Sequence, residues 1–125
     1  MTLVSVMEKI LESIRQATNI TPKPSWIGTS DTPPVVTVIH AGGGGEVLGL
    51  SDRALAVYDF QIDIWAKSAL QRDQIFDEIV EKLIRNWQTQ YQNHGWWSLS
   101  YTRVFDVEEE GLFRKTFIIT VKEVI

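Results

Sequence analysis

The chain has 125 residues, of which 44% are hydrophobic and 22% are charged, a composition typical of a folded domain and not of a disordered segment. It contains no cysteine, which excludes disulfides and thiolate metal sites. The formal net charge of −4 disfavours general attraction to nucleic-acid phosphates, because that attraction depends on lysine and arginine. The length predicts a single domain over residues 1–125.

Residues 2–17 have the apolar spacing of an amphipathic helix. Its predicted apolar face consists of Leu3, Val6, Met7, Ile10, Leu11 and Ile14. Charged residues such as Glu8, Lys9 and Glu12 interrupt this segment, which excludes a signal-peptide core and a membrane span. We therefore expect a soluble intracellular protein that does not use a membrane.

The next segment predicts two strands and a long loop. Pro22 and Pro24 end the helix and predict a short extended piece over residues 25–28. The β-branched run 35–39 predicts a buried strand. Residues 41–56 contain four successive glycines and no clear period, so they predict a mobile loop.

Two periodicities meet at Ser68. Apolar residues alternate from Tyr58 to Ile64, as in a strand with one buried face. Beyond Ser68 the spacing becomes helical up to Trp87, and Ser68 with Gln71 fits a capping box. After a polar link over residues 88–95, alternation over 97–105 and 113–121 predicts a closing hairpin.

The predicted order of elements is α-β-β-β-α-β-β. This order indicates an α+β fold with one mainly antiparallel sheet packed with two helices.

Candidate catalytic groups are few. The run Gly42–Gly45 is not followed by the lysine and helix of a phosphate-binding loop. His40 and His94 have no partner at ligand spacing, and Ser51-Asp52 lacks the surroundings of a nucleophile. We therefore expect no enzymatic activity, no cofactor and no metal.

A small metal-dependent nuclease is the enzymatic alternative, using Asp59, Gln61, Asp63 and Lys67. On a strand the two aspartates would lie roughly 13 Å apart, too far to share one ion. Lys67 lies beyond the predicted strand end. The alternation of these residues with apolar ones instead favours a solvent-facing strand surface.

Two adjacent tryptophans, Trp96 and Trp97, begin the closing hairpin. Neighbouring strand residues point to opposite faces, so both indoles cannot enter the same core. If Trp97 points inward with Leu99 and Tyr101, Trp96 is exposed and marks a partner surface. The alternative is that Trp96 packs under the end of the second helix near Trp87.

Three segments carry a resemblance to a known family: Tyr58–Ser68, Asp73–Leu83 and Arg114–Lys122. They resemble the tail terminator, or tail completion, proteins of long-tailed bacteriophages and prophages, and the element order is similar too. The resemblance implies a hexameric ring that caps the tail tube, ends tail elongation and forms the tail side of the head-tail joint. Its implied partners are the tail tube protein, the head connector protein and other copies of the chain.

This role would place the protein in the virion tail after assembly in the bacterial host cytoplasm. An acidic ring lumen would let DNA pass without specific binding, through like-charge repulsion. A non-enzymatic adaptor that uses Trp96 is a further alternative. The residues expected at an assembly interface are Gly42, Gly43, Gly44, Gly45, Glu46, Asp52, Arg53 and Trp96.

Overall fold

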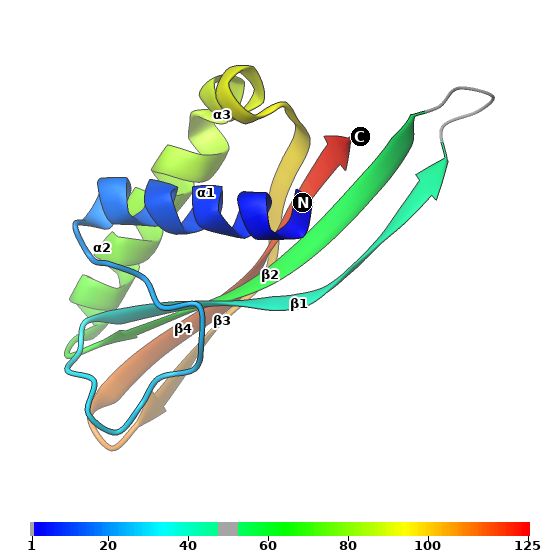
Figure 1. Ribbon diagram of the computed structural model, residues 1–125. Helices are drawn as coiled ribbons and strands as arrows, with labels where there is room; N and C mark the ends of the chain where they lie inside the picture. The colour runs from blue at the N-terminus through cyan, green and yellow to red at the C-terminus, as the bar shows by residue number, and fades with distance from the viewer. Residues whose placement is uncertain (1, 48–52) are drawn as a thin grey trace.

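One antiparallel sheet forms the centre of the molecule, and helices cover one of its faces (Figure 1). The computed structural model describes residues 2–47 and 53–125, and within these ranges it has three α-helices, one π-helical turn and four strands. In chain order the elements are α1 (Thr2–Thr18), β1 (Val35–Val47), β2 (Ala54–Ala66), α2 (Ala69–Val80), the π-helical turn η1 (Glu81–Arg85), α3 (Trp87–His94), β3 (Trp96–Glu109) and β4 (Leu112–Val124).

The strands lie in the order β1-β2-β4-β3, so β1 and β3 form the two edges of the sheet. The central strand β2 pairs along almost its whole length with β1 on one side and β4 on the other. The predicted α+β class with an antiparallel sheet is confirmed. The observed order, α-β-β-α-α-β-β, differs from the predicted one at two places.

The first difference is that residues 25–28 form no strand. Instead, Lys23 makes a single parallel bridge to Thr37 at the start of β1. The Lys23 N–H donates to the Val36 carbonyl over 2.9 Å, and the Val38 N–H donates to the Lys23 carbonyl over 2.8 Å. Pairing cannot extend further because the prolines on both sides of Lys23 have no N–H group.

The second difference is that the predicted polar link 88–95 contains the helix α3. The long predicted helix ends at Val80, and η1 separates it from α3. Gly95 ends α3 in the left-handed conformation, with a φ of 69°, and its N–H donates to the Tyr91 carbonyl over 2.8 Å. The sequence did not predict α3, because its residues are mostly polar and a helix without a clear apolar stripe shows no strong periodicity of apolar residues.

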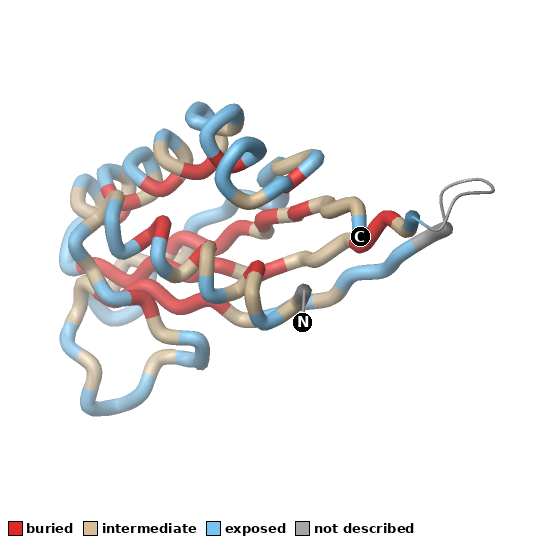
Figure 2. The backbone as a smooth tube through the Cα atoms, turned by 45° about the horizontal axis from the view of Figure 1, so that its top comes forward, coloured by how far each residue is buried: buried red, intermediate tan, exposed pale blue. Residues whose placement is uncertain are grey.

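The predicted amphipathic and capping patterns are present. Val6, Ile10 and Ile14 of α1 are fully buried and belong to the core that fills the space between helices and sheet (Figure 2). At the start of α2, the Gln71 N–H donates to Ser68 Oγ, and the Lys67 N–H donates to Gln71 Oε1. This reciprocal pair satisfies two backbone donors at the helix start.

No helix in the described ranges is both long enough and apolar enough to cross a membrane.

Packing of α2 on the sheet predicts a large loss of stability for Ile79→Ala. Ile79 is fully buried, so its truncation should lower the free energy of unfolding by about 2–5 kcal/mol. Leu70→Ala, also on α2 but 70% exposed, is the matched control and should change it by less than about 0.5 kcal/mol. Urea denaturation measures both, and equal effects would contradict this packing.

Candidate functional site

The four glycines lie in an edge strand, so the predicted loop over residues 41–56 is wrong for most of its length. Gly42–Gly45 belong to β1 and pair with Ala56–Asp59 of β2. A side chain at Gly43 would collide with the carbonyl oxygen of Val57, and φ at Gly43 is 159°. Glycine therefore allows the two strands to approach closely there.

The remaining predicted interface residues do not form one surface with these glycines. Glu46 lies in β1, and the exposed Arg53 precedes β2, whereas Asp52 lies outside the described residues. Trp96 lies in β3, at the opposite edge of the sheet. The structure therefore separates Trp96 from the glycine strand by the two central strands.

Of the two alternatives for Trp96, the buried one is found. Trp96 is fully buried in the core and contacts His94 in a tilted arrangement with 5.0 Å between ring centroids, whereas Trp97 is 55% exposed. A β-bulge between Trp96 and Ser98 explains why Trp97 points outward in place of Trp96. The extra residue lets Trp96 and Leu99, three positions apart, both pack on the core. Trp96 is thus a core residue and not a partner surface.

Both edges of the sheet are open over long stretches. The Lys23 bridge covers the start of β1, but beyond Val38 no backbone group in the described part of the chain pairs with this edge. The outer edge of β3 is likewise unpaired in residues 2–47 and 53–125. β3 also exposes apolar side chains, with Val104 40% and Phe105 57% exposed at a second bulge. Open edges of this kind are templates for pairing with another chain.

The candidate nuclease residues have structural partners. Asp63 is fully buried, contrary to the predicted solvent-facing surface, and its Oδ1 accepts from Arg114 Nε at 2.9 Å and lies 2.8 Å from Arg114 Nη2. Gln61 Nε2 donates to Asp63 Oδ2 over 2.8 Å, and Thr120 Oγ1 donates to Asp59 Oδ1 over 2.6 Å. Lys67 is exposed beyond β2. These contacts fix the aspartates within the sheet and pair the carboxylate of Asp63 with the guanidinium of Arg114.

Lys115 and Arg72 form a second charged cluster, which the sequence did not reveal, on the helix-covered side of the sheet. Lys115 Nζ lies 3.2 Å from Asp73 Oδ1 and 3.1 Å from Asp106 Oδ1, and Arg72 contacts both aspartates. Arg72 and, next, Lys115 hold the pKa of Asp73 below its usual range. The cluster joins the start of α2 to β3 and β4, so its role is to attach the helix to the sheet.

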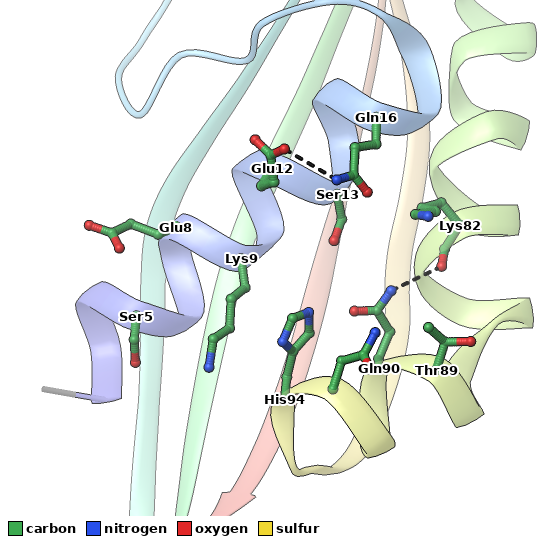
Figure 3. Close-up of a pocket in the computed structure, with 11 residues that line it drawn as sticks. Ser5, Glu8, Lys9, Glu12, Ser13, Gln16, Lys82, Thr89, Gln90 and His94 are labelled. Atoms are coloured by element: carbon green, nitrogen blue, oxygen red, sulfur yellow. Dashed lines mark hydrogen bonds between the residues drawn. The ribbon is translucent and has the colours of Figure 1, made fainter.

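A polar groove of about 300 Å³ lies between α1 and α3 (Figure 3). Its lining includes Lys9 and Ser13 of α1 and Gln90 and His94 of α3. Gln90 is almost fully buried, and its Nε2 donates to the Lys82 carbonyl over 3.3 Å. The charged lining residues are of both signs, namely Glu8, Lys9, Glu12 and Lys82, so the groove has no charge excess that would select an ion.

The two histidines lie apart. His94 lines the groove, whereas His40 is an exposed β1 residue that contacts Phe60, with 5.7 Å between ring centroids. Ser51, the candidate nucleophile, lies outside the described residues. Within the described ranges, no three histidine, aspartate or glutamate side chains group as possible metal ligands.

A comparison with protein-family models found no match, and a search of curated proteins found no significant match. Function therefore has to be inferred from the geometry of the described residues. The open edges of β1 and β3 are the surfaces in this geometry that can join one chain to another.

The buried ion pair predicts a strong effect of Asp63→Ala. This substitution leaves Arg114 without its carboxylate in a site where the guanidinium side chain is only 26% exposed. The free energy of unfolding should fall by about 2–4 kcal/mol. The double variant Asp63→Ala/Arg114→Leu should lose less unfolding free energy than the two single variants lose in sum, and the difference should be about 1–3 kcal/mol.

Glu81→Ala is the control for this cycle, because it breaks the exposed pair with Arg85 on η1. Chemical denaturation should show a change of less than about 1 kcal/mol for this variant. Strict additivity of the Asp63 and Arg114 substitutions would show that the pair is not coupled.

His94 predicts a pH dependence of stability. Burial, and then the charge of Lys9, lower the pKa of His94 below its ordinary value of 6.5. The unfolded chain therefore takes up a proton at His94 more readily than the folded protein does. The free energy of unfolding consequently falls as the pH drops from about 6.5 toward the lower pKa of His94 in the folded protein. Denaturation at several pH values should show this fall reduced in His94→Gln. The exposed His40→Gln is the control, and an equal reduction there would contradict the assignment.

Proposed function

We propose that this protein is a ring-forming structural protein of a bacteriophage or prophage tail, with the role of a tail terminator. The observation that carries the proposal is a sheet with two open edges and an even number of antiparallel strands. The sequence resemblance described above supplies the tail tube and the head connector as the proposed partners.

The strand directions favour a head-to-tail contact between copies. In the order β1-β2-β4-β3, each strand is antiparallel to its neighbour, so β3 runs antiparallel to β1. If a second copy pairs its β1 antiparallel to β3 of the first copy, each of its strands runs in the same direction as the corresponding strand of the first copy. Such a contact can repeat from copy to copy. The copies close into a ring when a whole number of the rotations between neighbours completes a full circle.

The two edges differ in their side chains. Gly44 of β1 has no atom within 4 Å of the position where a side chain would begin, so this edge offers little steric hindrance. Val104 and Phe105 of β3 are exposed apolar residues that a neighbouring copy would cover.

In such a ring the sheet face opposite the helices faces the lumen. This helix-free face carries Asp59, Ser100, Thr102, Thr120 and Lys122 along the strands that pair in register. It presents mainly polar side chains, with Val57 and Ile118 among them, and no run of lysine or arginine. DNA would therefore pass without the strong phosphate attraction of a DNA-binding protein. The protein acts here as a scaffold and not as an enzyme.

Charged substitutions at either edge should prevent ring formation without unfolding the chain. Gly44→Lys and Phe105→Lys each place a charge at a sheet edge, where it opposes pairing. Leu70→Lys, at a residue 70% exposed on α2, is the control and should leave assembly unchanged.

Electron microscopy of the protein mixed with its cognate tail tubes measures this assembly, since the tube can stabilise a ring that is weak alone. Capped tubes with ring density are expected for the parent chain and for Leu70→Lys. Absence of ring density with the parent chain would refute the terminator role. Full assembly of both edge variants would refute the pairing of edges.

A further inference from the structure

A pocket of about 240 Å³ lies at the end of the molecule where β3 turns into β4. This turn lies at the opposite end of the sheet from the end of β1 and the start of β2 (Figure 1). The lining includes the aromatic rings of Trp26 and Trp65, the apolar residues Val107 and Leu112, and the charged residues Glu109 and Arg114. It is separate from the glycine strand and from the groove between α1 and α3.

Two tryptophans and an arginine form a fixed platform in this pocket. Trp26 and Trp65 meet edge to face, with 5.1 Å between ring centroids and an interplanar angle of 87°. The Cζ atom of Arg114 lies 4.8 Å from the Trp26 centroid and 5.3 Å from the Trp65 centroid. Arg114 is itself held by the buried Asp63. The buried ion pair thus positions the aromatic rings through cation-π contacts.

The segment that carries Trp26 is also held in place. Asp31 Oδ2 accepts from Lys23 Nζ and from the Gly28 N–H, both over 2.6 Å. The Lys23 backbone is in turn bonded to β1. Despite this support, Trp26 remains 48% exposed. A large aromatic side chain that is held rigidly and left half exposed is typical of the central residues of protein interfaces.

One carboxylate near the β3–β4 turn lines the pocket. This residue is Glu109, and Glu110 follows it in the turn, whereas Glu108 lies on the opposite face of the strand, where its charge acts on Arg72. Within the described residues neither Glu109 nor Glu110 forms an ion pair, whereas the nearby Asp106 is bound by Arg72 and Lys115. The pocket therefore combines an apolar aromatic interior with an unpaired acidic rim.

We propose that this pocket binds a segment of a partner protein that presents an apolar side chain, phenylalanine or leucine, between lysine or arginine residues. The apolar side chain would pack against Trp26 and Trp65, and the basic residues would lie against Glu109 and Glu110. The acidic rim opposes nucleic acid at the same site, because phosphates would be repelled. This binding does not require the proposed ring.

The test uses the full chain, labelled with ¹⁵N, and three blocked tripeptides as probes. Acetyl-Lys-Phe-Lys-amide should shift the indole N–H resonances of Trp26 and Trp65 saturably, with a Kd of about 1 mM or tighter. Acetyl-Glu-Phe-Glu-amide and acetyl-Lys-Ala-Lys-amide should bind at least about fivefold more weakly, because each lacks one of the two required features.

Two variants with matched controls locate the binding site. Trp26→Ala should weaken the binding of acetyl-Lys-Phe-Lys-amide at least about tenfold, whereas Trp97→Ala, which removes a tryptophan of similar exposure in β3, should leave it unchanged. Glu109→Lys should weaken it by a similar factor, and Glu78→Lys on α2 should not.

Three results would overturn the proposal: no saturable shift with acetyl-Lys-Phe-Lys-amide, equal binding of the acidic peptide, or equal loss in Trp26→Ala and Trp97→Ala. Ring formation on tail tubes is a separate measurement, so failure of the pocket and failure of the terminator role can be told apart.

Discussion

The buried carboxylate of Asp63 determines how the helix-free face of the sheet is organised. A fully buried charge is costly unless it is paired, and here Arg114 and Gln61 are its partners. The guanidinium that neutralises Asp63 also lies over the indole rings of Trp26 and Trp65. One electrostatic requirement thus fixes a carboxylate, an arginine and two aromatic rings at one end of the sheet.

The two faces of the sheet are consequently stabilised in different ways. Apolar side chains from α1, α2 and the strands fill the helix-covered face, where stability comes mainly from removal of apolar surface from water. On the other face, the segment over residues 20–34 covers only the end near Asp63, and polar residues together with the half-buried Val57 and Ile118 occupy the rest. This division leaves the strand edges and the outer face available for contacts with other chains.

Much of this fold could be predicted from the sequence, because periodicity reports burial. The alternation around Phe60 and Ile62 and the apolar stripe of α1 are both found where the pattern placed them. The glycine strand could not be predicted, since glycine has no side chain to show alternation. The choice between the two alternatives for Trp96 depends on a β-bulge, which changes which residues share a face without a clear sign in the sequence.

The candidate site shows the same limit. The sequence indicated Asp59 and Asp63 as a strand pair, but it could not show that Arg114, 51 positions later, neutralises Asp63. It gave no sign that Trp26 would lie beside Trp65, because a loop brings these residues together. Contacts between residues distant in the chain are set by the fold as a whole, and periodicity carries no information about them.

The proposed edge contacts and the proposed tryptophan pocket lie on different sides of the molecule. The open edges of β1 and β3 lie on its two sides, across the strands, whereas the tryptophan pocket lies at one end, along the strands. Copies joined through their edges would therefore repeat sideways, and all their pockets would lie on one side of the ring. A partner with several basic, apolar segments could then bind many pockets at once, which raises its overall affinity far above that of a single segment. Weak binding to one pocket and firm attachment to a complete ring are for this reason compatible.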